Sequence, residues 1–286
     1  MPFFDESKAY AEQEDTYFDD GREEALVAFV QARTGIQNQP SKILDAIDDY
    51  GRKHKYLMNV GEDKGTIVSN LIREVKPKVM VELGGYCGYS TILFASVLKE
   101  AGGQKFYSLE KSPKFGKIIK TLVQLAGLDD IVEVVVGGST ESLQKLHDSG
   151  KLKQIDMMFL DHYKPLYTTD LKLCESLGMI KKGTLLAADN VIKPGNPRYL
   201  KYVRSTPQEK RMALEAGDPE VNASEAFKKF SITHAALYGS EEIPKGETSG
   251  NPNIIYQSDM VHSFEPTGVP DGVEITYCVG EESQSA

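Results

Sequence analysis

The chain has 286 residues, of which 40% are hydrophobic and 26% are charged. This composition is ordinary for a soluble globular protein and excludes a wholly disordered chain, and the length suits one large α/β domain or two small ones. Because 33 basic residues stand against 42 acidic ones, the formal net charge is −9, so neither nucleic acid nor an anionic membrane is expected as the main partner.

Residues 1–21 are predicted to form an acidic tail that is mobile unless its aromatic side chains dock. The tail lacks the basic residues of a signal or transit peptide, and no apolar run approaches the roughly 20 residues that span a bilayer. Cys87, Cys174 and Cys278 are odd in number and widely spaced, which disfavours a disulfide framework or a zinc site. These features favour a cytoplasmic protein.

Three helices are predicted before the first strand, at residues 22–33, 41–50 and 67–75. Short apolar runs then alternate with helical stretches. The runs lie at 79–83, 105–109, 131–136, 155–160 and 184–188, and the helices between them at 90–101, 113–126, 140–148 and 166–177. Continuously apolar strands that alternate with helices predict a doubly wound, mostly parallel α/β sheet covered by helices on both faces.

The pattern loosens after residue 204. Residues 206–231 are charged and helix-prone, residues 239–253 form a loop rich in glycine, proline and serine, and residues 271–279 alternate like a closing strand. We treat 205–262 as an insertion in a single domain that spans 22–286, because the segment lacks the apolar periodicity of an independent core.

Polar residues follow each predicted strand at its carboxyl end. They are Glu82, Glu110, the turn 137–140, Asp161 with His162, and Asp189 with Asn190. Ligands of open parallel sheets bind beyond the carboxyl ends of the strands, near the point where the strand order reverses. This edge is therefore where we expect the site.

The turn after the first strand contains Gly84, Gly85 and Gly88, which allow the backbone to approach a ligand closely. Their spacing differs from GxGxxG, which disfavours a dinucleotide. Glu110, at the end of the next strand, is placed to accept both hydroxyls of a ribose. An adenosine that carries a positive charge, such as S-adenosylmethionine, suits this combination of turn and acid, and the alternative is a glycine cluster without a ligand.

Asp161, Asp189 and Asn190 would together form a site of hard oxygen ligands, which suits Mg²⁺ better than zinc. The alternative is that these residues cap the helices that follow them. Lys164 follows Asp161 by three residues. A neighbouring divalent cation would favour its neutral form, so that it could serve as a general base; by itself it would be a solvated surface residue.

Four stretches in the same order resemble the catechol O-methyltransferase family: 58–65, 82–90, 159–164 and 188–195. The resemblance runs from about residue 22 to about 204 and resumes at Phe264-Glu265. It implies a Rossmann-like methyltransferase fold, S-adenosylmethionine and Mg²⁺ as cofactors, and methyl transfer to one hydroxyl of a catechol-type vicinal diol.

The resemblance also implies roles for individual residues. Asp161, Asp189 and Asn190 match metal ligands, Lys164 the general base, and Glu265 the carboxylate that holds the second hydroxyl. The positions that match cofactor contacts are Met58, Val60, Glu82, Gly84, Tyr86, Ser90, Glu110, Ser139, Thr140, Asp161 and His162. Those that match the substrate slot are Tyr56, Tyr163, Lys164, Asn190, Pro194 and Glu265.

The chain departs from the family at two points. Animal members carry tryptophan at the positions of Tyr56 and Tyr163, whereas this chain has no tryptophan; the acidic tail and the 205–262 insertion are absent from the compact family form. Two other functions remain open: methylation of another phenolic diol of the caffeoyl ester or flavonoid type, and S-adenosylmethionine binding without catalysis. An NAD-linked oxidoreductase is disfavoured by the glycine spacing.

Overall fold

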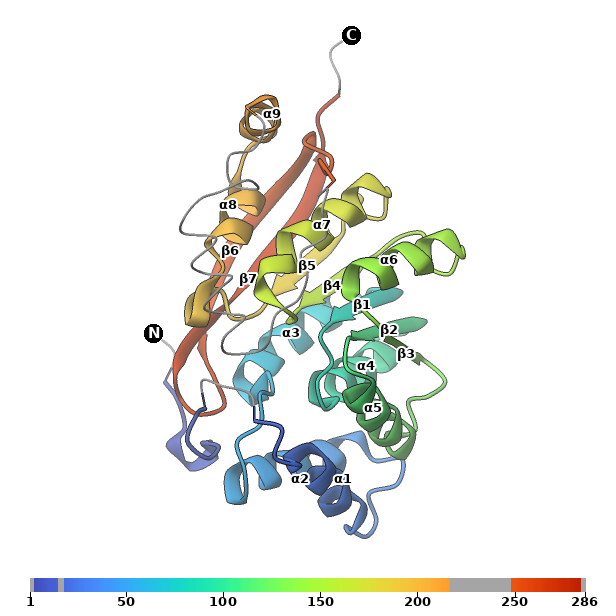
Figure 1. The fold of residues 1–286 in the computed structure, drawn as a ribbon, viewed down its shortest axis with the longest axis vertical. Coiled ribbons are helices and arrows are strands. Elements are labelled where there is room, and N and C mark those ends of the chain that lie inside the picture. Colours follow the sequence, from blue (N-terminus) through green and yellow to red (C-terminus); the bar gives the residue numbers. More distant parts are fainter. Residues whose placement is uncertain (1–2, 15–17, 217–247, 284–286) are drawn as a thin grey trace.

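The computed structural model describes residues 3–14, 18–216 and 248–283 (Figure 1). Three helices precede the sheet: α1 (Arg22–Gln31), α2 (Pro40–Lys53) and α3 (Gly61–Val75). All three were predicted, but α3 begins at Gly61 rather than Ile67. Its first turn carries Glu62 and Asp63, which favour a helix N-terminus electrostatically although they interrupt the apolar pattern.

A seven-stranded sheet forms the centre, in the order β3-β2-β1-β4-β5-β7-β6. Its strands are β1 (Val79–Leu83), β2 (Lys105–Glu110), β3 (Val132–Val136), β4 (Met157–Leu160), β5 (Leu185–Ala188), β6 (Ile254–Phe264) and β7 (Pro270–Glu281). The first five pair in parallel, whereas β7 runs antiparallel to both β5 and β6. The predicted doubly wound, mostly parallel sheet is confirmed.

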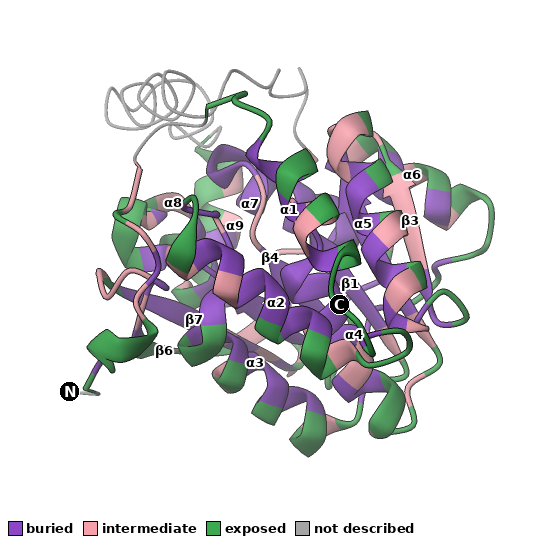
Figure 2. Ribbon diagram, turned by 90° about the horizontal axis from the view of Figure 1, so that it is seen from below, coloured by how far each residue is buried: buried purple, intermediate pink, exposed green. Residues whose placement is uncertain are grey.

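Helices cover both faces of the sheet (Figure 1). Those of the second half of the fold are α4 (Tyr89–Glu100), α5 (Pro113–Ala126), α6 (Ser139–Asp148), α7 (Tyr167–Ser176) and α8 (Pro197–Arg204). Met80 of β1 packs in a core shared with α1–α5, whereas Val81 and Leu83 pack in a second core with α6–α8. Both faces of β1 are thus buried, as Figure 2 shows for the interior, which explains why β1 and its neighbours β4 and β5 are largely apolar.

Two elements were not predicted. Helix α8 begins where the Asn196 side chain accepts a hydrogen bond from Tyr199 N (3.3 Å) and Pro197 takes the first helical position, so a cap and a proline start it. Strand β6 lies largely inside the segment 205–262, which was predicted to be an insertion, and pairs with β7 in the main sheet; the bounds of the insertion stay a prediction. Because β6 is an edge strand, it tolerates many polar residues, and these obscured the alternation of apolar and polar residues in the sequence.

Within the rest of the predicted insertion, the structure describes a short helix, α9 (Pro207–Glu215), in the segment expected to be helix-prone. Residues 217–247, including most of the predicted loop 239–253, lie outside the described residues. The assignment of 22–286 to one domain stays a prediction.

The N-terminal tail docks through its aromatic residues. Phe4 and Tyr10 are buried, and the Tyr10 hydroxyl donates to Asp48 Oδ1 (2.5 Å) on α2. Tyr10 N donates to Pro266 O (2.8 Å) in the β6–β7 turn, and Ala11 N to Gly51 O (2.9 Å) on α2. The tail therefore connects α2 to the β6–β7 hairpin. Gln13 of the tail lines the cavity described below.

The three cysteines are buried and form no disulfide, in agreement with the spacing argument. None of the helices in the described part of the chain is both long enough and apolar enough to cross a membrane.

Candidate active site

A cavity of about 520 Å³ opens at the carboxyl ends of β1, β2, β4 and β5, where the strand order reverses between β1 and β4. The predicted site residues that line it are Tyr56, Met58, Val60, Gly84, Tyr86, Ser90, Glu110, Ser139, Asp161, His162, Tyr163, Lys164, Asp189, Asn190, Pro194 and Glu265. Glu82 and Thr140 do not line it. The polar residues that follow the predicted strands thus converge on one cavity.

The glycine turn brings the loops after β1 and β4 into contact. Gly84 has φ +90°, and a Cβ there would lie 2.5 Å from Asp161 O, so only glycine fits without displacement of the backbone. Glu110 fastens the same turn: its Oε2 accepts from Tyr86 N (3.0 Å) and its Oε1 from Ser112 N (2.7 Å). The Glu110 carboxylate is therefore fixed beside the turn at one end of the cavity.

Glu82 lies behind the cavity wall and is fully buried. Its Oε2 accepts from Thr91 Oγ1 (2.5 Å) and Ser108 Oγ (2.7 Å). Burial raises the pKa of Glu82 to about 7, more than the hydrogen bonds from Ser90, Thr91 and Ser108 lower it. Because Ser90 lines the cavity, Glu82 can act on a ligand only through its neighbours.

Asp170 of α7, which the sequence analysis did not select, orders two of the predicted cofactor positions. Its Oδ1 accepts from Thr140 Oγ1 (2.6 Å), and its Oδ2 lies 2.8 Å from His162 Nε2. The His162 ring stacks on Tyr167, with centroids 4.9 Å apart and planes 10° apart. One buried carboxylate therefore fixes the wall formed by His162 and the start of α6.

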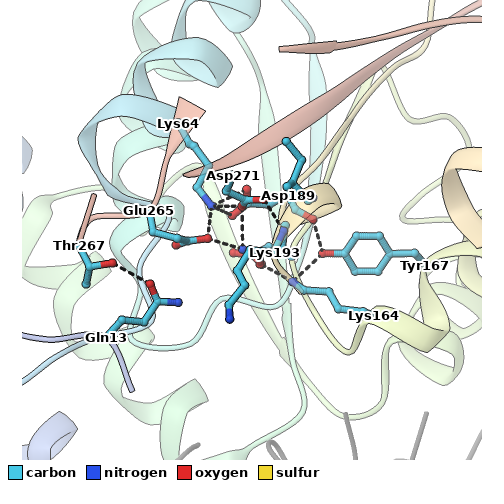
Figure 3. Close-up of polar contacts among 12 residues, drawn as sticks. Gln13, Lys64, Lys164, Tyr167, Asp189, Lys193, Glu265, Thr267 and Asp271 are labelled. Atoms are coloured by element: carbon cyan, nitrogen blue, oxygen red, sulfur yellow. Dashed lines mark hydrogen bonds and ion pairs between the residues drawn. The ribbon is translucent and has the colours of Figure 1, made fainter. Parts of the chain in front are cut away.

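Behind the other end of the cavity lies Lys64 of α3, which does not line the cavity but holds Asp189 and Glu265, which do (Figure 3). Its Nζ lies 2.9 Å from Asp189 Oδ2, 2.8 Å from Glu265 Oε1 and 2.9 Å from Asp271 Oδ2. We call Asp189, Glu265 and Asp271 the carboxylate cluster. Lys64 is fully buried, so these ion pairs act in a medium that screens charge far less than water does.

Burial and mutual repulsion set the pKa values of the cluster. Burial raises the pKa of Asp189 to about 7, against the lowering effect of Lys64. Burial also raises the pKa of Glu265 to about 8, with repulsion from Asp189 and Asp271 added. For Asp271, Lys64 and other hydrogen-bond donors outweigh burial, and its pKa is lowered.

Asp271 orders the loop that follows β5. Its Oδ1 accepts from Ile192 N (3.1 Å) and Lys193 N (2.9 Å), and its Oδ2 from Asn190 Nδ2 (3.1 Å). Asn190 Nδ2 also donates to Glu265 Oε1 (2.6 Å). Asn190 has φ 56°, a left-handed conformation that asparagine tolerates better than most residues, and it does not begin a regular helix.

Lys164 is held beside Asp161, as its spacing suggested. Its Nζ donates to Asp161 Oδ1 (2.8 Å) and to the Tyr167 hydroxyl (2.9 Å). The Tyr167 hydroxyl in turn donates to Asp189 O (3.3 Å). Only 7% of Lys164 is exposed, so the alternative of a solvated surface lysine is excluded.

The donor set at this end fits Mg²⁺. Asp161 and Asp189 follow Leu160 and Ala188, which are paired across β4 and β5. Both Asp189 oxygens lie near Lys64 Nζ (2.8 and 2.9 Å), and Asp189 Oδ1 makes no other hydrogen bond, so this buried carboxylate has the capacity to bind a cation as well. Among the described residues no group of three or more acidic, histidine or cysteine side chains forms a metal site by itself, so the predicted set depends on the amide of Asn190.

The charge balance favours a cation as well. Asp161 and the three members of the carboxylate cluster carry four negative charges when ionised, and Lys64 and Lys164 carry two positive ones. With all four ionised the excess is two negative charges, which one divalent cation would balance; the raised pKa values of Asp189 and Glu265 show that this excess is unfavourable without a cation.

The mouth of the cavity contains two residues that the sequence analysis missed, Gln13 and Lys193. Gln13 Oε1 accepts from Thr267 Oγ1 (2.7 Å), across 254 residues of sequence. Lys193 directly precedes Pro194, and its side chain is exposed. No local pattern could have placed Gln13 here, whereas the position of Lys193 beside a predicted substrate residue was a usable signal.

Comparison with known proteins agrees with this geometry. The O-methyltransferase family model matches residues 37–218. The chain is 41% identical to catechol O-methyltransferase from Bos taurus over 169 residues, which cover 59% of this chain and 61% of the bovine protein. It is 38% identical to catechol O-methyltransferase from Mus musculus over 187 residues, which cover 65% of this chain and 69% of the mouse protein.

The chain thus matches less than two thirds of the length of the bovine relative. In three dimensions the chain resembles an O-methyltransferase from Bacillus cereus in complex with SAH, with a TM-score of 0.54. The match covers 89% of this chain and 96% of the B. cereus chain at 18% sequence identity. At this low identity the likeness shows the fold alone. The family model covers well over half of the sequence and the mouse relative is matched over more than two thirds of its length, so the chain belongs to the catechol O-methyltransferase family.

Proposed function

We propose that the protein transfers a methyl group from S-adenosylmethionine to one hydroxyl of a catechol-type vicinal diol, with Mg²⁺ bound and Lys164 as the general base. The observation that carries this proposal is that one cavity is lined by the glycine turn after β1 and by the group formed by Asp161, Lys164, Asp189 and Glu265. The family membership and the names of the relatives support the same reaction.

The end of the cavity beside the glycine turn would hold the methyl donor. S-Adenosylmethionine supplies a methyl group on a positively charged sulfur, which is already an activated leaving group. Glu110, fixed by two backbone N–H groups, would accept the ribose hydroxyls. His162, held by Asp170, would contact the adenine. The B. cereus protein was solved with SAH, which is consistent with such a ligand.

The opposite end would hold the diol. Asp161, Asp189 and Asn190 would bind Mg²⁺, which lowers the pKa of a bound hydroxyl and fixes its direction. Glu265 would accept a hydrogen bond from the second hydroxyl; its Oε1 is already held by Lys64 and Asn190, so the carboxylate has a fixed direction. Most of the rate gain would come from alignment, which can contribute roughly 7–11 kcal/mol in favourable cases.

Lys164 would perform the proton transfer. Its Nζ, positioned by Asp161 and Tyr167, accepts the proton of the attacking hydroxyl. The hydroxyl oxygen then forms the new C–O bond as the C–S bond breaks, and S-adenosylhomocysteine is the second product. Proton, methyl group and charge are all accounted for without a further reactant.

The test is turnover of catechol with S-adenosylmethionine and Mg²⁺, followed by product mass. We expect a singly methylated product, loss of turnover in excess EDTA, and a loss of at least about 100-fold in Lys164→Met, the usual contribution of a general base. Lys164→Met should still bind S-adenosylhomocysteine, and the exposed Lys182→Met is the control.

Full activity in EDTA would contradict the role of the metal. A wild-type protein that binds the cofactor and forms no methylated product would contradict the enzymatic function and favour binding without catalysis.

A further inference from the structure

Two hydrogen-bond donors face the mouth of the cavity from opposite parts of the chain. Lys193 comes from the loop after β5, and Gln13 from the docked N-terminal tail; both line the same cavity. Figure 3 shows the Lys193 side chain directed away from the carboxylate cluster. It therefore points away from the reacting end and toward the part of the acceptor that does not react.

Both groups are attached to ordered structure. Lys193 N donates to Asp271 Oδ1 (2.9 Å), which fixes the backbone from which the side chain extends. Gln13 Oε1 accepts from Thr267 Oγ1 (2.7 Å), so its amide nitrogen is the end available to a ligand. In the view of Figure 3 this nitrogen lies on the side of Gln13 that faces Lys193.

The acidic groups that line the cavity are engaged at its inner end. Asp161 pairs with Lys164, and Asp189 and Glu265 pair with Lys64. Glu110 accepts from two backbone N–H groups beside the glycine turn. Lys193 therefore brings a positive charge to the mouth, and Lys111 is the other lysine outside the reacting end that lines the cavity.

The net charge of the whole chain, −9, would repel an anion at long range. Salt limits that effect, because the Debye length is about 8 Å at physiological ionic strength. A carboxylate in direct contact with an ammonium and an amide N–H is governed by those contacts instead, since hydrogen bonds between charged partners are shorter and stronger than neutral ones.

From this arrangement we infer that the preferred acceptor is a catechol whose ring substituent carries a carboxylate, which Lys193 Nζ and the Gln13 amide bind at the cavity mouth. The inference rests on the proposed function, because the diol end must be held by Lys164 and Glu265 for the substituent to reach the mouth. It makes Lys193 a specificity-determining residue and gives the docked tail a part in substrate choice.

The experiment compares caffeate with its methyl ester, which share the diol and differ in charge, and with the cationic acceptor dopamine. For the full chain with S-adenosylmethionine and Mg²⁺ we expect kcat/KM to favour caffeate over the ester about five- to tenfold, the range of one charged contact at a partly exposed site. Lys193→Ala should bring this ratio close to one and Lys193→Glu should reverse it, mainly through KM, because the contact is remote from the reacting atoms.

Lys182→Ala is the matched control, since it removes one exposed positive charge away from the cavity and should keep the wild-type ratio. Thr267→Val removes the hydrogen bond that holds the Gln13 amide. It should lower the ratio of kcat/KM for caffeate to that for the ester, but less than Lys193→Ala does. An unchanged ratio in Lys193→Ala, or a wild-type preference for the ester or dopamine, would overturn the inference alone. If no acceptor is methylated, the proposed function fails and the inference fails with it.

Discussion

Lys64 shows how far the structure of the site depends on a single side chain. In the sequence it stands between Asp63 and Gly65 and carries no sign of burial, yet its Nζ contacts three carboxylates that lie 125, 201 and 207 residues further along the chain. Removal of one member of a buried ion group leaves its partners unbalanced. Lys64 therefore holds α3, the end of β5 and the β6–β7 hairpin together at the site.

Glu82 gives a testable consequence at the same scale. Its pKa is about 7 in the folded protein against an ordinary value of 4.5. The folded state thus keeps a proton that the unfolded chain releases. This group's stabilising contribution is present below pH 4.5 and is lost as the pH rises through 7, by about 3 kcal/mol in total.

Urea unfolding of wild type and Glu82→Gln between pH 4.5 and about 8 measures this contribution. We expect the free energy of unfolding to fall more steeply with pH in wild type than in Glu82→Gln, with a difference of about 3 kcal/mol between the two ends of the range. The exposed Glu141→Gln should keep the wild-type slope. Equal slopes for wild type and Glu82→Gln would show that the Glu82 pKa is not raised.

At the scale of elements, the sequence predicted best where burial was greatest. The five parallel strands were found because each is largely apolar; β1, β4 and β5 are almost wholly buried, whereas β3 at the sheet edge is only half-buried. Strand β6 was missed because an edge strand needs little apolar surface, and its partner β7 supplies the register. The start of α3 was missed because acidic residues precede its apolar face.

The docking of the tail can be tested at Gly51 of α2. A Cβ on Gly51 would lie 2.5 Å from Tyr10 Cε2, so Gly51→Ala must displace the Tyr10 ring and break its hydrogen bond to Asp48. We expect the amides of Tyr10 and Ala11 to exchange hydrogen faster, with a loss of about 1–3 kcal/mol in stability.

Hydrogen exchange followed by mass spectrometry of the N-terminal peptide makes the measurement. Tyr10→Phe, which removes the hydrogen bond but keeps the ring, should have a smaller effect. Unchanged protection of the Tyr10 and Ala11 amides in Gly51→Ala would contradict the packing of the tail on α2.

For the whole molecule, topology accounts for the part of the site that could be predicted. Parallel strands end at one edge, so Glu110, Asp161, Asp189 and Asn190 were expected to meet there, and they line one cavity. Residues outside the parallel strands could not be placed in this way. Asp271 and Gln13 reach the site through the antiparallel hairpin and the docked tail, whose positions depend on packing over long sequence distances.

The proposed function requires that one cavity hold the cofactor and a metal-bound diol at the same time. Calorimetric titration of catechol into the protein saturated with S-adenosylhomocysteine, with Mg²⁺ and then with EDTA, measures this without turnover. We expect one catechol binding site with Mg²⁺ and an affinity at least about tenfold weaker in EDTA. Equal catechol affinity under both conditions would contradict it.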